Sequence, residues 1–291
     1  MALPLTTRAR AKVNLDLRVL GRRADGYHEL ESLVAFAGVG DTLSLDPGAS
    51  LSLTLAGPRA EGLTVDDGNL VLRAARALAA ARPDLRLGRF RLVKRLPVAS
   101  GIGGGSADAA AALRLLARLN GIAPGDSLLR EVAAGVGADV PVCLDSRARL
   151  MAGIGEKLGP MLRLPPLFAV LVNPGVGVET VAVFRALGLK AGEMVSEARA
   201  TNIAAPALAA GLLDYLKSTT NDLAAPAQRV APVIDEVLER LAALPGCRLA
   251  RMSGSGATCF ALFDDCTISA AAAKVLQSER PGWWVKPTLL S

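Results

Sequence analysis

The sequence predicts an α+β protein of two domains. Its first half is rich in strand-like segments before helices begin to alternate with them, and a new strand pattern starts near residue 150. A strand at 89–94, a glycine-rich run at 97–106 and an Ala/Leu-rich helix at 107–119 follow one another directly. With 291 residues the chain is long enough for two cores, and we expect domains at 1–155 and 156–291.

Composition narrows the class of protein. Hydrophobic residues make up 51% of the chain and charged residues 21%, which excludes disorder. The net charge of +6 favours anionic partners, but the basic residues are scattered, which fits small phosphorylated ligands as well as nucleic acid. His28 is the only histidine and the four cysteines form no CxxC pair, so a zinc site is not expected. We find no signal-peptide or membrane-spanning pattern and expect a soluble, cytoplasmic protein with buried, reduced cysteines.

The elements of the first half follow from periodicity. Residues 9–19 alternate between apolar and polar side chains, which predicts a half-buried strand with Lys12 and Asn14 on its polar face. The Asp25-Gly26 pair predicts a hairpin turn after it. Strands are expected at 30–45 and 51–55, and a helix at 69–81 that ends before Pro83.

The glycine-rich run after residue 96 predicts a phosphate-binding loop. Glycines let successive backbone N–H groups face an anion, and the first turn of the following helix adds free amides and a positive dipole end. The run is not a dinucleotide fingerprint, because Ser106 stands where the third glycine belongs, and it is not a Walker A loop, because no lysine follows Gly105. The alternative is a flexible connector in which Ser106 is an ordinary helix N-cap.

The second half reads as alternating helices and strands. A helix at 127–136 stops at residues 137–141, and 151–156 is interpreted as a crossover. A strand at 167–172 precedes a helix from about Thr180, while 190–220 shows only weak periodicity. A long helix at 223–244, interrupted at Pro226 and Pro232, leads to strands at 248–252 and 258–263 around the small-residue loop 253–256. A helix at 269–277 and a strand at 283–289 end the chain.

Short motifs in a fixed order then identify a family. They include residues 11–15, 23–28, 97–110, 137–141, 153–156, 173–175 with Thr180 and Phe184, 221–223 and 253–256. Together they resemble the GHMP small-molecule kinases over residues 11 to about 262, and the Asp25-Gly26-Tyr27-His28 run, the triple glycine and the 137–141 segment resemble the branch that acts on cytidylyl-methylerythritol.

The resemblance implies a fold and a reaction. It implies an N-terminal domain like domain 2 of ribosomal protein S5, which binds ATP, a ferredoxin-like C-terminal domain, and a substrate site at the interface of the two. The reaction is then ATP-dependent phosphorylation of the 2-hydroxyl of 4-diphosphocytidyl-2-C-methyl-D-erythritol, with Mg²⁺, in the non-mevalonate isoprenoid pathway. The partner is a small cytidine diphosphate derivative rather than nucleic acid or a membrane, and the chain is a monomer or a homodimer.

The resemblance also assigns roles to residues. Asp139 is the base that takes the hydroxyl proton, and Lys12 keeps it ionised and stabilises the transition state. Substrate contacts fall to Asn14, Tyr27, His28, Thr180 and Phe184, with Tyr27 and Phe184 stacking on the two faces of cytosine and His28 at its edge. The ATP and phosphate contacts are Asn69, Pro97, Val98, Ala99, Ser100, Gly101, Ile102, Gly103, Gly104, Gly105, Ser106 and Ala107.

Each role has a structural alternative. Lys12 taken alone is a solvated strand lysine, Asp139 a residue between a helix end and a proline, and Phe184 part of an apolar helix face. Ser106 is the one candidate side chain for Mg²⁺, and Asp108 is interpreted as complementing the helix dipole. The 253–256 loop either brackets the site or makes a tight hairpin.

Two other functions stay open at this point. One is a different GHMP kinase, such as a homoserine or mevalonate kinase, against which the Tyr27-His28 pair argues. The other is an RNA-binding module, which the basic charge would suit but which usually presents exposed aromatic stacking platforms.

Overall fold

The computed structural model describes residues 4–197 and 205–291. Their contacts divide the chain into two compact units, each assembled from segments that alternate along the sequence. The first unit contains the chain up to Ala11, Val39–Val98 and Gly103–Ser146, and the second contains Lys12–Gly38, Ala99–Ile102 and Arg147–Ser291. The second unit therefore contains segments from both halves of the chain. The division into domains at 1–155 and 156–291 stays a prediction.

The first unit is built on a small sheet. Its strands are the first part of β1 (Leu5–Asn14), the second part of β3 (His28–Pro47), β4 (Ser52–Ala56) and β5 (Gly88–Val93). β5 runs antiparallel to β3 and parallel to β4. Parallel neighbours need a crossover connection, and α1 (Leu70–Ala81) supplies it.

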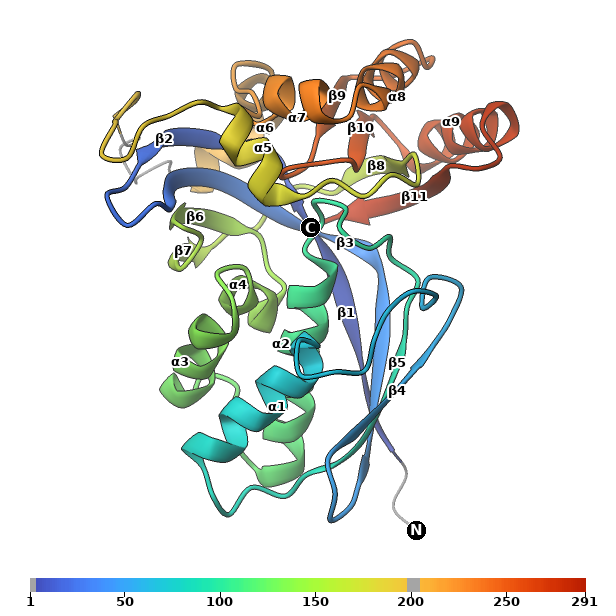
Figure 1. The fold of residues 1–291 in the computed structure, drawn as a ribbon. Helices are drawn as coiled ribbons and strands as arrows, with labels where there is room; N and C mark the ends of the chain where they lie inside the picture. The colour runs from blue at the N-terminus through green and yellow to red at the C-terminus, as the bar shows by residue number, and fades with distance from the viewer. Residues whose placement is uncertain (1–3, 198–204) are drawn as a thin grey trace. The chain divides into compact units, whose positions relative to one another are not determined.

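Helices cover one face of this sheet (Figure 1). They are α1, α2 (Gly104–Asn120), α3 (Ser127–Val136) and α4 (Val140–Asp145). α2 buries an unbroken run of small residues from Ala109 to Ala112 together with Leu113, Leu115 and Leu116. Small side chains allow neighbouring elements to approach closely, so α2 packs tightly along its middle, from Ala107 to Ala117.

The second unit begins with a hairpin around the first part of β3. β2 (Arg18–Arg22) pairs antiparallel with it, and the predicted Asp25-Gly26 turn is confirmed with Gly26 at φ +90°. On the other side β3 pairs with β6 (Arg149–Gly153), which pairs in turn with β7 (Lys157–Met161).

The C-terminal part of the second unit has a βαββαβ arrangement. Its strands are β8 (Leu167–Asn173), β9 (Leu249–Met252), β10 (Cys259–Phe263) and β11 (Trp284–Leu290), all antiparallel in the order β11-β8-β10-β9. The connection from β8 to β9 contains α5 (Thr180–Ala186), α6 (Ala205–Lys217), α7 (Ala224–Val230) and α8 (Val233–Ala242), and β10 leads to α9 (Cys266–Glu279). The chain order 4-1-3-2 confirms the expected ferredoxin-like fold.

The predicted strand at 9–19 is wrong in its extent and in its exposure. β1 ends at Asn14, and a short irregular stretch precedes β2. The polar face is buried as well as the apolar one, since Lys12 and Asn14 are each 4% exposed and Asp16 is fully buried. Alternation indicates a strand, but it cannot distinguish a polar face that meets water from one that meets other polar groups.

Other boundaries differ for local reasons. Residues 149–161 form the β6–β7 hairpin rather than a crossover, and α4 follows Asp139 directly, because Pro141 is accepted in the first turn of a helix. The long helix expected at 223–244 is two helices separated at Pro232, whereas Pro226 lies in the first turn of α7. The remaining predicted elements are confirmed, except that the stretch 198–204 lies outside the described residues.

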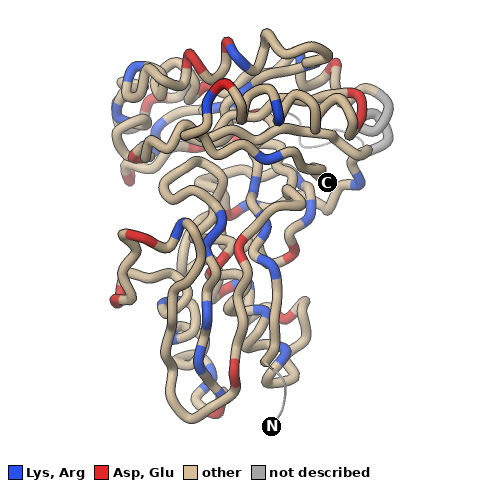
Figure 2. The backbone as a smooth tube through the Cα atoms, turned by 90° about the vertical axis from the view of Figure 1, so that its right-hand side faces the viewer, with Lys and Arg blue, Asp and Glu red and all other residues tan. Residues whose placement is uncertain are grey.

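Charge is distributed rather than gathered. Figure 2 shows Lys and Arg interspersed with Asp and Glu along the backbone, as the sequence suggested. Within the part of the chain that the structure describes, no helix combines the length and the apolar character that crossing a membrane requires.

Candidate active site

The glycine-rich loop joins β5 to α2 and ends in an uncapped helix start. α2 begins at Gly104, three residues earlier than expected, with Gly103 as its N-cap at φ +61° and no side chain bonded to the first-turn amides. The interpretation of Ser106 as the N-cap is therefore wrong, since Ser106 is the third residue of the helix. Gly103 takes that place because its left-handed conformation costs nothing without a Cβ. The first turn of α2 keeps its N–H groups available to an anion.

Four successive carbonyl groups of the loop are fixed by hydrogen bonds. Val178 N–H donates to Ala99 O at 3.1 Å and Thr258 N–H to Ser100 O at 3.1 Å. The Ser253 hydroxyl donates to Gly101 O at 3.0 Å, and Lys12 N–H donates to Ile102 O at 3.0 Å. In a trans peptide the N–H points opposite to the carbonyl. Anchoring these carbonyls therefore also fixes the N–H groups of the next residues, 100 to 103, each of which points away from the anchored carbonyl of its own peptide.

The loop between β9 and β10 presses directly on this segment. A Cβ on Gly101 would lie 2.4 Å from Ser253 O, and one on Gly254 would lie 2.7 Å from Gly101 O. Both glycines also have positive φ, at +72° and +56°. The residues 253–256 thus connect two strands and support the glycine loop at the same time, because only glycine fits where the two backbones meet.

Asn221 holds the supporting loop in turn. Its amide donates to Met252 O and to Gly254 O, both at 2.8 Å, and its oxygen accepts from Leu223 N–H at 3.0 Å. Ser253, Thr258 and Asn221 support the glycine loop, and residue types alone did not identify them. For Ser253 and Asn221 the available signal was membership of the 253–256 and 221–223 motifs, whereas Thr258 lies in neither motif.

Lys12 and Asn14 lie beside the loop on β1. The backbone of Lys12 binds Ile102, as described, and its side chain is buried. The Asn14 backbone donates to the Ser253 hydroxyl at 3.0 Å and its side-chain amide donates to the Ser32 hydroxyl at 2.7 Å. The Asn14 Oδ1 atom is buried and accepts no hydrogen bond. The structure thus brings both predicted residues to the glycine loop.

Asp139 precedes α4 in the first unit. It occupies the N-cap position of that helix with φ −85° and makes no side-chain cap hydrogen bond, and it is half-buried. Lys12 belongs to the second unit and Asp139 to the first. Their pairing therefore stays a prediction.

The three ring residues are arranged differently from the expected sandwich. Tyr27 is 59% exposed, whereas His28 stacks on Phe184 with ring centroids 4.6 Å apart and 27° between the planes. Phe184 also packs against the core of the second unit, so its structural role is real. Burial, and then the charge of Arg22, lower the pKa of His28, and its Nε2 atom is buried without a partner.

Thr180 and Asn69 both begin helices. Thr180 is the first residue of α5, and its hydroxyl lies 2.8 Å from the Ser255 hydroxyl, which connects it to the supporting loop. Asn69 caps α1 by accepting from Val71 N–H at 3.0 Å and donating to Thr64 O at 3.3 Å. The Asn69 side chain therefore has a structural role at the start of α1. Its contact with adenine stays a prediction.

A buried ion cluster lies beneath the start of α2. The Lys94 ammonium donates to Asp41 at 2.5 Å and to Asp108 at 2.7 Å, with all three side chains at most 5% exposed. Asp41 also accepts from the N–H groups of Arg95 and Leu96 at the end of β5. Asp108 therefore pairs with Lys94, and its interpretation as a residue that complements the helix dipole is wrong.

The electrostatics of this cluster follow from burial. Burial alone would lower the pKa of Lys94, but the two carboxylates outweigh it and raise that pKa. Burial raises the pKa of Asp108 to about 7, against the opposing charge of Lys94. A Cβ on Gly104 would lie 3.6 Å from Lys94 Nζ, so the cluster lies near the first residue of α2.

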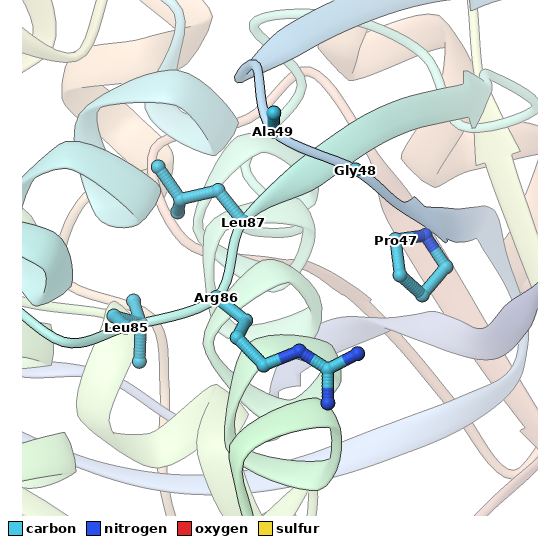
Figure 3. A pocket seen from close by; sticks show the side chains of 6 residues that line it. All are labelled: Pro47, Gly48, Ala49, Leu85, Arg86 and Leu87. Atoms are coloured by element: carbon cyan, nitrogen blue, oxygen red, sulfur yellow. The ribbon is translucent and has the colours of Figure 1, made fainter.

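A separate pocket carries none of the predicted site residues. It has a volume of about 420 Å³ and is lined by Pro47, Gly48, Ala49, Leu85, Arg86 and Leu87 (Figure 3). Arg86 contributes the one charged side chain of this lining, and the backbone N–H of Arg86 is bound by Asn120.

Comparison with known families gives two matches along the chain. Residues 69–147 match the GHMP kinases N terminal domain, and residues 204–280 match the GHMP kinases C terminal domain. The first match contains the glycine loop, α2 and Asp139, and the second contains the loop at 253–256.

Whole-length relatives agree with these matches. The chain is 60% identical to a protein of Methylobacterium radiotolerans over 98% of this chain and 99% of that one, and 57% identical to a protein of Rhodopseudomonas palustris over 100% and 98%. Both are named 4-diphosphocytidyl-2-C-methyl-D-erythritol kinase.

Solved structures show the same relationship at the level of the fold. A crystal structure of 4-(cytidine 5'-diphospho)-2C-methyl-D-erythritol kinase is 34% identical with a TM-score of 0.78, covering 99% of both chains. A homoserine kinase from Cytophaga hutchinsonii is 19% identical with a TM-score of 0.69 over 100% of this chain and 95% of that one, a likeness of fold alone.

Proposed function

This chain belongs to the 4-diphosphocytidyl-2-C-methyl-D-erythritol kinases, a family of GHMP kinases, and we propose from this premise that it transfers the γ-phosphoryl group of ATP to the 2-hydroxyl of that diphosphocytidyl substrate. The products are the 2-phosphate and ADP, and the reaction is a step of the non-mevalonate isoprenoid pathway. A small-molecule acceptor fits the dispersed basic charge better than nucleic acid does.

The observation that carries the proposal is the fixed orientation of the glycine loop. Its carbonyls at Ala99–Ile102 are all bonded to neighbouring segments, so a bound anion meets N–H groups rather than carbonyl oxygens. The uncapped start of α2 adds its amides and its dipole directly afterwards. Phosphoryl transfer depends mainly on positioning and on neutralising charge, and such a loop supplies both for the phosphates of ATP.

The acceptor hydroxyl needs a base and a positive charge. We assign the base to Asp139, a half-buried carboxylate directly before α4 and the residue to which the family resemblance gives this role. Lys12 is buried on the strand that binds Ile102, next to the phosphate loop, where little water screens its charge. There its ammonium stabilises the negative charge that develops during transfer.

Magnesium fits this site as an ion held mainly by phosphate. Among the described residues no three His, Cys, Asp or Glu side chains gather to hold a metal on their own. Mg²⁺ is usually bound through substrate phosphates, water and one or two protein oxygens. The half-exposed Ser106 hydroxyl in the first turn of α2 is the protein oxygen that suits it. When bound, the ion neutralises phosphate charge.

Cytosine recognition falls to the Tyr27–His28 segment. His28 has a lowered pKa and is therefore neutral at pH 7, so its ring can read a base edge through the unpartnered Nε2. The stack on Phe184 fixes the plane of the imidazole. Tyr27 keeps an exposed face on which a base can stack.

A panel of acceptors tests the function. Purified protein with ATP and Mg²⁺ should release ADP with 4-diphosphocytidyl-2-C-methyl-D-erythritol, and a coupled assay should show no release above background with homoserine or mevalonate. Cytidine diphosphate, but neither of those two acceptors, should raise the melting temperature. Turnover of homoserine or mevalonate in place of the cytidylyl substrate would make the protein a different GHMP kinase.

A further inference from the structure

Ser32 lies behind Asn14 on the neighbouring strand. It belongs to β3 and is 4% exposed. Its hydroxyl oxygen is 2.7 Å from Asn14 Nδ2 and 2.5 Å from the carbonyl oxygen of Asp16. These two contacts connect three buried polar residues in the second unit.

The direction of each hydrogen bond in this connection is fixed by chemistry. A backbone carbonyl can only accept, so the Ser32 hydroxyl donates its one hydrogen to Asp16 O. The Ser32 oxygen must then accept from Asn14, which places the NH₂ group of that amide toward Ser32. The carbonyl oxygen of the amide, Oδ1, consequently faces the opposite way.

Asp16 is held firmly enough to impose this direction. Its Oδ1 accepts from Leu33 N–H at 2.6 Å and its Oδ2 accepts from the Tyr215 hydroxyl at 2.8 Å, and the side chain is fully buried. The carbonyl of Asp16 therefore has little freedom to turn away from Ser32. On the other side, the Asn14 backbone is bound to the Ser253 hydroxyl, which itself donates to Gly101 O.

Asn14 Oδ1 is left as a buried acceptor without a donor. It accepts no hydrogen bond in the structure and lies 3.4 Å from the point that a Cβ on Gly254 would occupy. A buried acceptor without a donor is costly, so it calls for a partner such as an ordered water or a ligand group. A ligand donor would belong to a molecule bound beside β1 and the glycine loop, where the proposed function places the acceptor alcohol.

We propose that Ser32 is a positioning residue that locks the Asn14 amide so that its Oδ1 accepts a hydrogen bond from a hydroxyl group of the acceptor substrate. The proposal rests on the proposed function for the identity of that acceptor. Without the Ser32 hydroxyl the amide can rotate by half a turn and present NH₂ instead of oxygen. The donating hydroxyl of the acceptor substrate would then face the Asn14 NH₂ group, which cannot accept its hydrogen bond.

The test compares two buried serines. Ser32→Ala should raise KM for the cytidylyl acceptor by about tenfold, which is the order of one hydrogen bond, and leave KM for ATP within about twofold. Ser32→Thr retains the hydroxyl and should restore most of the affinity. Ser269→Ala is the matched control, because Ser269 is 3% exposed in the same unit and bonds only within α9, to Cys266 O at 3.1 Å.

A readout without turnover separates this inference from the function. The side-chain amide resonances of Asn14 in ¹H–¹⁵N spectra of the free protein should shift in Ser32→Ala and not in Ser269→Ala. If KM for ATP and for the acceptor rise equally in Ser32→Ala, in step with a lowered melting temperature, Ser32 is a structural residue only and the inference is overturned. Unchanged amide resonances would overturn it too. Absence of transfer in the wild-type protein would count instead against the proposed function.

Discussion

Asp139 and Lys12 carry the proposed chemistry, and local structure prepares each of them. Lys12 is buried on β1, where its backbone already binds the glycine loop. Asp139 stands directly before α4 and is not used as a capping side chain.

The role of Asp139 predicts a loss in rate rather than in binding. In Asp139→Asn, kcat should fall by about 10²-fold or more, because an amide cannot accept the hydroxyl proton. KM for ATP should change by less than about threefold. Steady-state kinetics with both substrates measure this, and a kcat within a few-fold of wild type would show that Asp139 is not the base.

Single residues were predictable where a motif fixed their role and unpredictable where a distant partner did. The motifs selected Lys12 and Asn14, and the structure places both beside the glycine loop, while their roles in the reaction stay predictions. The pairing of Asp108 was not predictable, since its partner Lys94 is 14 residues away and also donates to Asp41, which is 53 residues from Lys94. Residue type shows that a carboxylate can accept, but only the fold shows from which group.

The start of α2 differs from the sequence prediction, and the difference changes the role of Ser106. Serine before an Ala/Leu-rich run is a usual N-cap, so the pattern favours a helix that begins after Ser106. The structure begins the helix at Gly104 because Gly103 adopts the left-handed conformation there. Propensity cannot reveal such a shift, because several glycines in a row allow many starting points.

This difference makes a test of the loop possible. Ser106→Ala should leave the melting temperature unchanged or slightly higher, because Ser106 caps nothing and alanine favours helix. KM for ATP should nevertheless rise by roughly fivefold, since the hydroxyl that suits phosphate or Mg²⁺ is lost.

Asp126→Ala provides the control for that test. Asp126 is a true N-cap in the same unit, with its side chain accepting from Leu128 N–H at 2.9 Å, and its loss should cost about 0.5–2 kcal/mol of unfolding free energy. KM for ATP should be unaffected in it. A lowered melting temperature of Ser106→Ala together with an unchanged KM for ATP would show that Ser106 caps α2 and does not contribute to ATP binding.

The overall architecture was more predictable than the way the chain is distributed within it. The α+β class and the ferredoxin-like C-terminal part are confirmed, because strand and helix periods are local and their order is specific. The interleaving of the two compact units was not foreseen, because β1 and β3 each contribute to both units. Long-range pairing of that kind leaves no trace in composition or spacing.

The central claim concerns the product, and ³¹P NMR of a completed reaction tests it most directly. With ATP, Mg²⁺ and 4-diphosphocytidyl-2-C-methyl-D-erythritol, the spectrum should gain one phosphomonoester resonance in equal amount to the ADP formed, while the diphosphate of the cytidylyl group stays intact. This result is expected if the pinned glycine loop binds ATP and the acceptor hydroxyl is phosphorylated. ADP formed without a new phosphomonoester, or a phosphomonoester formed by cleavage of the cytidylyl diphosphate, would contradict the account.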